Sequence, residues 1–415
     1  MSKFLKITKY GFVIIVLLVI TTGFKQNENQ PITKVIDKYF NSYLNSFKTL
    51  KYEELSEIVE DNENTTMYLS MNRVFIERYK SCGLSYKDYK YKYQIMDLDI
   101  REDVANIKVN LNVEYEYNNL PKNVSSQINN IDYKFELKKY NESWRIVRID
   151  TNFDEFSDFK SKVDNYRLSQ QRIMKMDAIK EVENQEINKI KNSKLKKNKY
   201  DNEIEEKKQE KDEIKFRDFF EDKNKFCDKD LGTRYAREYA VALEDKRIFY
   251  TAKDNDCTNF VSQCVWASLG AYDPNDIEKT KKYINNGINM IKGIWLGNSY
   301  GVTLAWANVE EFWKLCTTSS AGPKAVGINN NRPYTSINPK EIKVGDVLQI
   351  RKKGDIRYKH SVYVTYVAPN NKEYNGIYVS QHDYDKYNRS LVNLIYAWGD
   401  DECYIRRLDF HDCIK

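Results

Sequence analysis

The fold of the C-terminal half is decided by one stretch of sequence, DCTNFVSQC, which occupies residues 256–264. Its apolar residues and those that follow recur at helical spacing: Phe260, Val261, Cys264, Val265 and Leu269. Asn255 and Asp256 are residue types that cap helix N-termini. The pattern therefore predicts a helix that has Cys257 in its first turn.

A cysteine at this position has the chemistry of a nucleophile. The field of a helix N-terminus and a neighbouring imidazolium favour the thiolate, so Cys257 is expected to react with iodoacetamide at mildly acidic pH much faster than a model thiol. The helix end formed by Asn255, Asp256 and Cys257 would also hold the oxyanion of a tetrahedral intermediate. The alternative for Cys257 is a small buried core residue, which is our interpretation of Cys264, two turns further along.

Two of the three histidines in the chain are expected to complete the site. A β-prone alternating run begins at His360, residues 369–371 are a turn signal, and a second run ends at His382. The hairpin that these segments form would place the two histidines roughly opposite each other. His360 is the predicted base and His382 the predicted orienting residue, the alternative for each being a structural histidine.

From about residue 234 to 410 the chain resembles the bacterial "putative amidase domain" family, a relative of the CHAP and NlpC-type papain-fold peptidases. The DCTNFVSQC block is the specific part of this resemblance. Weaker blocks lie at residues 234–240, 304–309, 344–349 with 359–362, and 380–385 with 389–391.

The resemblance implies a papain-like fold and an amide or peptide bond as substrate. It also implies Cys257 as nucleophile, His360 as base and His382 as the polar residue that orients the base. Two positions depart from the family pattern: Lys359 stands where an acidic residue is frequent, and Asp383 where a threonine is frequent.

No cofactor and no metal are expected, because the sequence has no closely spaced histidine set, no paired cysteine knuckle and no glycine-rich phosphate loop. Trp295 and Trp306 are candidates for a substrate groove, since aromatic rings offer a large rigid contact area. Ordinary core packing is the favoured interpretation of both tryptophans.

The N-terminus predicts export. Three lysines precede an apolar run of about ten residues at 11–20, which is too short for a comfortable membrane span. Residues 1–24 are therefore a signal peptide or an uncleaved N-terminal anchor. The catalytic unit would then lie outside the cell, in the cell wall or anchored to the membrane.

Seven cysteines in an exported chain leave at least one thiol unpaired, and Cys257 is the natural candidate. The other six allow fifteen complete pairings, among which Cys227 and Cys413 would tie the ends of the catalytic unit together. Unpaired cysteines throughout are the alternative.

Length and pattern predict an α+β protein with several parts. Residues 30–155 have helical spacing followed by alternating strands, an order that resembles the helix-plus-curved-sheet domains of the NTF2-like type. Residues 156–228 form a charged helical linker, in which fourteen of the twenty residues from 194 to 213 are charged. A flexible linker is the alternative. Residues 229–415 form the papain-like unit.

Two functions remain open. The first is an exported cysteine amidase or peptidase that acts on cell-wall peptides or extracellular protein, by hydrolysis or by acyl transfer. The second is a non-catalytic cell-wall-binding or assembly module that retains a papain-like cleft. The two differ in whether Cys257 and His360 meet. Nucleic acid is not an expected partner, because the net charge of +6 arises from intermixed basic and acidic residues.

Overall fold

The computed structural model describes residues 30–122, 124–170, 173–193, 227–253, 256–320, 322–369 and 373–413, without the side chains of residues 154 and 411–413. The predicted export signal at 1–24 and residues 194–226 of the predicted linker lie outside this part. Among the described helices, none combines the length and apolar character needed to cross a membrane.

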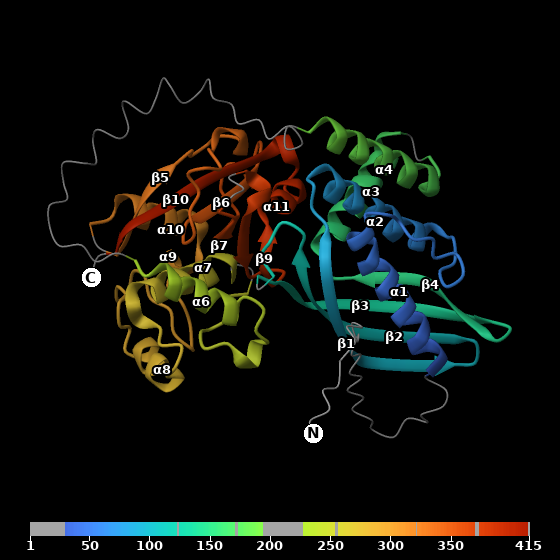
Figure 1. Cartoon of the computed structure of the whole chain (residues 1–415), viewed down its shortest axis with the longest axis horizontal. Coiled ribbons are helices and arrows are strands. Elements are labelled where there is room, and N and C mark those ends of the chain that lie inside the picture. The colour runs from blue at the N-terminus through green and yellow to red at the C-terminus, as the bar shows by residue number, and fades with distance from the viewer. Residues whose placement is uncertain are drawn as a thin grey trace, which may run out of the picture.

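The N-terminal unit, residues 30–193, packs helices against an antiparallel sheet (Figure 1). Its elements are α1 (Gln30–Thr49), α2 (Glu63–Ser81), β1 (Tyr86–Arg101), β2 (Val104–Tyr117), β3 (Ser126–Tyr140), β4 (Ser143–Thr151), α3 (Asp154–Ser169) and α4 (Lys175–Asn192). Strand β2 buries alternate residues, Ile107, Val109 and Leu111 among them, because side chains alternate between the two faces of a strand. The predicted α+β class is confirmed, and the NTF2-like type stays a prediction.

Helices α3 and α4 correct the predicted linker. The sequence predicts a solvated spacer from residue 156 to 228, but α4 packs on α2, and its residues Ile179 and Val182 are buried in the core of the N-terminal unit. Arg73 of α2 also pairs with Glu183 of α4 at 2.6 Å. The high proportion of charged residues in this segment hides, at the level of sequence, the one apolar face of α4 that is buried.

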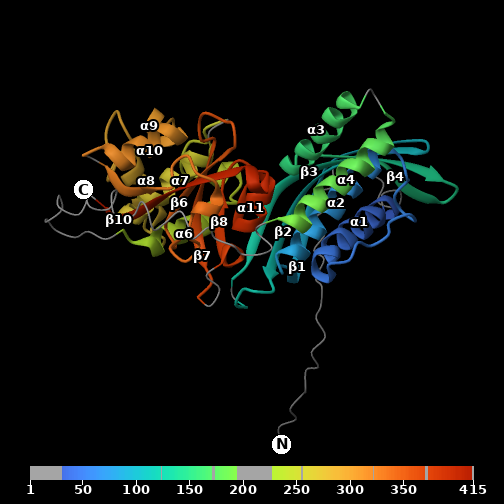
Figure 2. The same cartoon turned by 90° about the horizontal axis from the view of Figure 1, so that it is seen from above.

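The C-terminal unit, residues 227–413, surrounds a second part of the sheet with helices (Figure 2). Its helices are α6 (Lys229–Tyr239), α7 (Asp256–Trp266), α8 (Ile277–Asn285), α9 (Leu304–Ala307), α10 (Val309–Thr318) and α11 (Leu391–Ala397). Its strands are β5 (Pro323–Ile328), β6 (Val347–Lys352), β7 (His360–Val367), β8 (Ile377–Gln381), β9 (Lys386–Ser390) and β10 (Cys403–Cys413). The relation to papain-like proteins stays a prediction.

One sheet runs through both units. Its order is β1-β2-β3-β9-β8-β7-β6-β10-β5, with β4 paired to β3, and the paired strands are antiparallel. The junction is the short pairing of β3 with β9, in which Gln127 lies opposite Tyr387 and Ile128 opposite Lys386. Figures 1 and 2 place α11 at this junction, where Tyr396 of α11 and Ser81 of α2 share a hydrogen bond of 3.0 Å.

The cysteines follow neither of the patterns that the sequence leaves open. Cys227 is in a disulfide, so the cysteines are not unpaired throughout. Complete pairing is also wrong, because five cysteines are buried free thiols: Cys82, Cys257, Cys264, Cys316 and Cys403. The side chain of Cys413 is outside the described part, so its pairing with Cys227 stays a prediction.

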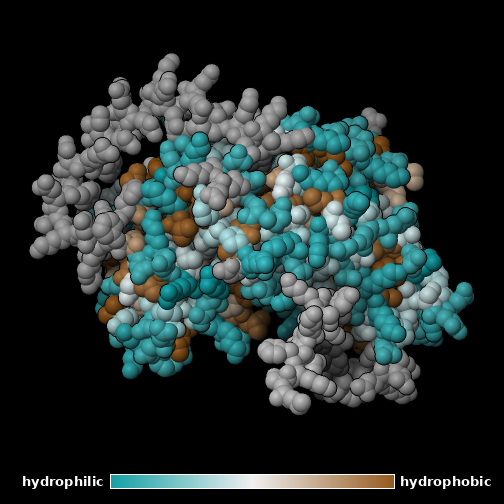
Figure 3. Space-filling model, in the orientation of Figure 1, coloured by the Kyte–Doolittle hydropathy of each residue, from teal (hydrophilic) through white to brown (hydrophobic). Residues whose placement is uncertain are grey.

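The surface is polar and mixes both signs of charge. The face shown in Figure 3 is mostly hydrophilic, with small scattered apolar areas. Exposed opposite charges pair with each other, as in Lys38 with Glu57 at 2.6 Å and Lys281 with Glu278 at 2.8 Å. Such pairs lower the positive potential that a polyanion would need.

Candidate active site

Helix α7 has Cys257 in its first turn, as the sequence predicts. All residues of the helix are buried, because it packs against α6, α9 and strand β7. The Asp256 carboxylate fixes the start of the helix. Its Oδ1 accepts the backbone N–H of Ala252 at 2.9 Å and the side-chain amide of Asn259 at 2.6 Å. The backbone that carries the thiol is therefore held rigidly.

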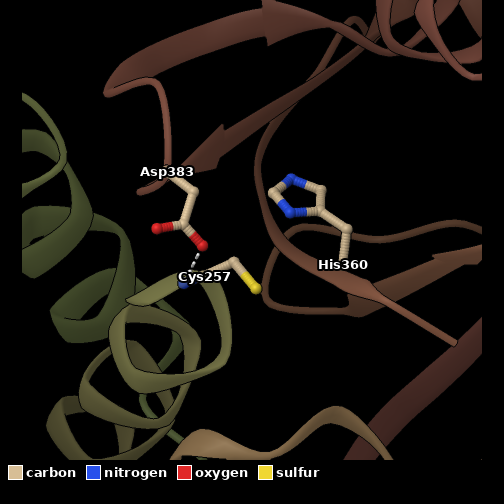
Figure 4. Close-up of side chains that lie close together, drawn as sticks. All are labelled: Cys257, His360 and Asp383. Carbon is tan, nitrogen blue, oxygen red and sulfur yellow. Dashed lines mark hydrogen bonds between the residues drawn. The ribbon is translucent and has the colours of Figure 1, made fainter. Parts of the chain in front are cut away.

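Three side chains from distant parts of the chain meet at this helix end: Cys257, His360 and Asp383 (Figure 4). The sulfur, one ring nitrogen and one carboxylate oxygen all lie within 4.8 Å of one another. Cys257 is in the first turn of α7, His360 is the first residue of β7, and Asp383 lies in the turn between β8 and β9. The structure thus brings Cys257 and His360 together and adds a carboxylate that the sequence analysis leaves unassigned.

The turn that carries Asp383 has an unfavourable backbone. Gln381 pairs with Lys386 across the hairpin, and Asp383 and Tyr384 between them have φ angles of 58° and 68°. Two successive positive φ angles are typical of a type I′ turn, which usually contains asparagine and glycine. Such strain concentrates at functional sites. Here it directs Oδ2 of Asp383 to the backbone N–H of Cys257, at 3.0 Å.

The surroundings of the Cys257 sulfur favour the thiol. Cys257 is 3% exposed, and burial, reinforced by the charge of Asp383, raises its pKa to about 12. The backbone N–H of Ser361 and the hydroxyl of Thr258 act to lower this pKa but do not offset burial. These surroundings therefore oppose the preformed thiolate that the sequence predicts, and rapid alkylation at mildly acidic pH stays a prediction.

Asp383 is affected by the same burial. Removal from water raises the pKa of its carboxyl group, and the hydrogen bond from the Cys257 backbone N–H opposes this rise. The carboxylate form is therefore held in place by the start of the helix that carries the thiol.

His360 is held by an aromatic neighbour. The residue is 8% exposed, and its ring stacks on Trp398 with centroids 5.8 Å apart and planes inclined by 22°. An indole face attracts cations, so Trp398 favours the imidazolium once His360 has taken a proton. The preceding Lys359 is exposed, and its ammonium group pairs with Asp355 at 2.9 Å.

His382 does not orient His360, contrary to the sequence prediction. Its Nδ1 lies 2.7 Å from Oδ2 of Asp256, and its Nε2 lies 2.9 Å from the backbone oxygen of Tyr239. A carboxylate and a carbonyl only accept, so each of these contacts suits a ring nitrogen that donates. The ring also stacks on Phe260, with centroids 4.3 Å apart. His382 is thus a buried ring that supports helix α7 through Asp256 and Phe260.

Asp256 is the hydrogen-bond partner of His382 at the start of the helix. Burial acts to raise the pKa of the Asp256 carboxyl group, but the hydrogen bond and charge of His382 lower it below its ordinary value. Oδ2 of Asp256 also accepts a hydrogen bond from the Arg247 guanidinium at 2.9 Å. The carboxylate therefore belongs to the support of the helix.

The register of the β7–β8 hairpin explains why the prediction chose the wrong residue. The predicted hairpin places His382 opposite His360. The strands instead pair Tyr363 with Ser380. In this register His360, three residues before Tyr363, corresponds to Asp383, three residues after Ser380 and just beyond the end of β8. A shift of one residue exchanges the two faces of a strand. Asp383 therefore takes the place predicted for His382.

Trp295 and Trp306 do not line a groove. Both are fully buried, with ring centroids 4.7 Å apart. Their indole N–H groups donate to residues of α7: Trp306 to Asn259 at 2.8 Å and Trp295 to Ser262 at 3.3 Å. The two rings brace the helix from the core, which is the ordinary packing that the sequence favours.

The predicted oxyanion support also changes. The backbone N–H of Cys257 donates to Asp383. The Asp256 carboxylate is already paired with Arg247 and His382, and Asn255 lies outside the described residues. A substrate oxyanion that uses the Cys257 N–H would have to displace the Asp383 carboxylate from it.

The cluster of Cys257, His360 and Asp383 also has the composition of a metal site, because sulfur, imidazole nitrogen and carboxylate oxygen are the ligands of zinc. The sequence predicts no metal, because it has no closely spaced histidine set and no paired cysteine knuckle. A thiol site and a three-ligand zinc site must therefore be separated by experiment.

Residues 227–406 match the model of the family described as "Putative amidase domain". The matched segment contains the cluster of thiol, imidazole and carboxylate. It is similar to an amidase family, which suggests hydrolysis of an amide. No curated protein matches the chain.

Solved structures give matches of low overall similarity. The intermembrane space region of the chloroplast protein ARC6 is 14% identical, covers 31% of this chain and 98% of its own, and has a TM-score of 0.23. A "Putative Scytalone Dehydratase" from Novosphingobium aromaticivorans is 14% identical, covers 30% of this chain and 84% of its own, and has a TM-score of 0.22.

Proposed function

We propose that this chain is an exported cysteine amidase or peptidase that hydrolyses an amide bond in cell-wall peptides. The observation that carries the proposal is the meeting of Cys257, His360 and Asp383 within 4.8 Å at a helix N-terminus. The family match at residues 227–406 supports an amide as the bond that is cleaved. The basic and short apolar segments of residues 1–24 support export, and hence a substrate outside the membrane.

In the proposed reaction, His360 removes the thiol proton while the sulfur of Cys257 attacks the amide carbonyl carbon. General-base help is needed because a pKa of about 12 leaves almost no thiolate at neutral pH. The tetrahedral intermediate collapses as His360 returns the proton to the leaving amine, which leaves a thioester on Cys257. The same imidazole then deprotonates a water molecule, which hydrolyses the thioester to a carboxylic acid and the free thiol.

Asp383 has two opposite effects in this scheme. Its charge holds the proton on Cys257 in the resting site and stabilises the imidazolium of His360 after the proton has moved. The residue therefore slows ionisation of the free thiol and favours the transition state, in which the positive charge develops on the ring.

Asp383→Asn separates these effects. The variant keeps an oxygen that can accept the Cys257 N–H but removes the negative charge. Because that charge raises the pKa of the thiol, its loss should lower the pKa and speed alkylation of Cys257 by iodoacetamide at pH 8. Turnover should fall by about 10²-fold as the imidazolium loses its counter-charge. Faster alkylation together with unchanged turnover would remove Asp383 from the mechanism.

A non-catalytic wall-binding module needs no contact between a thiol and an imidazole. The distance between Cys257 and His360 therefore favours the enzyme. The direct test incubates the full chain with purified cell-wall peptides and with casein, and identifies released fragments by mass. Cys257→Ser is the matched control, and a parallel sample contains EDTA.

The expected result is cleavage of wall peptides by the parent chain, with or without EDTA, and none by Cys257→Ser. Equal fragments from the parent and the serine variant would contradict the proposal. Loss of cleavage with EDTA would assign the reaction to a metal at the cluster, and cleavage of casein alone would overturn the wall substrate.

A further inference from the structure

We propose that the N-terminal unit completes the active site of the C-terminal unit, through a β-bulge at Asn129 and Asn130 that positions the turn carrying Asp383. The inference rests on the proposed function, because it concerns the geometry of the same cluster. It assigns Asn130 as a positioning residue, which acts on the site through the β8–β9 hairpin.

The bulge lies where the two units join. Along β2 and β3 the pairing passes from Leu111 with Ile131 to Val113 with Ile128, so Asn129 and Asn130 of β3 together lie opposite the single residue Asn112 of β2. Such a bulge bends the strand and redirects its side chains. The next residue pair toward the C-terminal unit is Ile128 with Lys386. Lys386 is the first residue of β9 and lies two residues beyond Tyr384. The bulge is therefore placed beside the strained turn.

Hydrogen bonds from the bulge reach that turn directly. The Asn130 side-chain amide donates to Oδ2 of Asp385 at 3.3 Å, and the Asn129 backbone N–H donates to the Asp385 carbonyl at 3.5 Å. The Asn129 side-chain amide donates to the backbone oxygen of Val241 at 3.0 Å, in the segment that follows α6. Two asparagines of the N-terminal unit thus contact both the β8–β9 turn and the segment after α6 in the C-terminal unit.

The contact continues to the start of α7. Asp385 pairs with Arg247 at 2.5 Å, and the other terminal nitrogen of Arg247 pairs with Asp256 at 2.9 Å. These side chains are between 6% and 12% exposed, so water screens the pairs little. A continuous series of polar contacts therefore links Asn130 to the residue before Cys257.

The junction around the bulge is built for permanent contact. Arg389 of β9 is 5% exposed and pairs with Glu155 of the N-terminal unit at 2.8 Å. Ser126 donates to the backbone oxygen of Asn388 at 2.9 Å, and the Asn388 amide returns a hydrogen bond to the backbone oxygen of Ser125 at 2.9 Å. Polar groups of β9 that are buried at the junction are thus paired with the N-terminal unit, and separation of the units would break these hydrogen bonds.

These contacts matter because the turn does not favour its own conformation. Asp383 and Tyr384 both have positive φ angles, and neither is glycine. A hairpin of this kind is held in one geometry only when its surroundings determine it. The bulge and the β3–β9 pairing hold the turn in this geometry. The distance of Asp383 from His360 therefore depends on the N-terminal unit.

The test uses Asn130→Gly in the full chain. Asn130 has a φ angle of 61°, so glycine keeps the backbone and removes only the side-chain amide. Asn141→Gly is the matched control, because Asn141 has a φ angle of 55° in the exposed turn between β3 and β4. Asn130→Asp is the third variant, in which a carboxylate would face the Asp385 carboxylate.

The expected result for Asn130→Gly is a kcat about tenfold lower with little change in KM, because the positioning of a catalytic group is lost and substrate contacts are kept. Amide hydrogen exchange over residues 382–386 should become faster, and the pH midpoint of Cys257 alkylation should shift. Asn130→Asp should change all three in the same direction by a larger amount, and Asn141→Gly should leave them at parent values.

Exchange and alkylation need no turnover, so they test the positioning role even where the proposed amidase activity fails. Parent-like exchange and alkylation in Asn130→Gly would overturn the inference. If Asn130→Gly does not fold, Asn129→Ala takes its place, because it removes the hydrogen bond to Val241 without a positive φ angle. Its exchange over residues 382–386 must then exceed that of Asn141→Gly.

Discussion

Cys257→Ala is expected to lower turnover by about 10⁵-fold or more while the chain remains folded. Loss of the nucleophile removes the thioester route altogether, and in thiol and serine enzymes such a loss costs on the order of 10⁵ to 10⁶ in kcat. Only one sulfur atom is removed from a packed helix, so the free energy of unfolding should fall by about 1 kcal/mol. The rate at which peptide is released from wall material measures the loss of turnover, and thermal unfolding measures the loss of stability.

Cys264→Ala is the matched control. Cys264 lies two turns further along α7, is fully buried and is also a free thiol. The same atom is removed from the same helix, so the loss of stability should be similar, and turnover should stay within about twofold of the parent. Equal loss of activity in both variants would show that packing of α7, rather than the thiol of Cys257, determines the rate.

The sequence predicts the thiol half of the site well, because that half depends on local pattern. Residues 256–264 specify a helix with Cys257 in its first turn, and the β-prone run from His360 specifies the strand that carries the imidazole. Local spacing is enough for these elements. The approach of the two is then a consequence of α7 packing on β7.

The third member of the cluster is not local. Asp383 depends on a register that differs by one residue from the predicted hairpin and on a turn with two positive φ angles at non-glycine residues. The only signal in the sequence is the departure from the family pattern, an aspartate where a threonine is frequent.

The pKa of Cys257 is another property that the sequence does not contain. A helix N-terminus lowers a thiol pKa only where the thiol remains solvated or faces cations. Here the helix is buried along its whole length. The charged group that acts on the thiol is the Asp383 carboxylate, which raises the pKa of Cys257 further. Burial and charge sign both depend on tertiary packing, so the motif alone does not determine the protonation state of the thiol.

The second large effect is expected when the two histidines are replaced, because one replacement should lower turnover and the other should lower stability. His360→Ala should lower turnover by about 10⁴-fold with little loss of stability, since it removes the base. His382→Ala should instead destabilise the chain by about 1–3 kcal/mol, because the buried Asp256 carboxylate loses the hydrogen bond to His382 and keeps only Arg247 on that oxygen. Turnover at low temperature and thermal unfolding, measured on both variants, separate the two roles.

The pH dependence of stability gives an independent check on His382. The pKa of Asp256 in the folded chain lies below its ordinary value, so its contribution to stability is full above the unfolded pKa and is lost as pH falls through the folded pKa. His382 is the partner that lowers this pKa against burial. In His382→Ala the stability should therefore vary less between neutral and acidic pH than in the parent. A variant that unfolds like the parent at every pH, yet loses as much turnover as His360→Ala, would return His382 to the catalytic group.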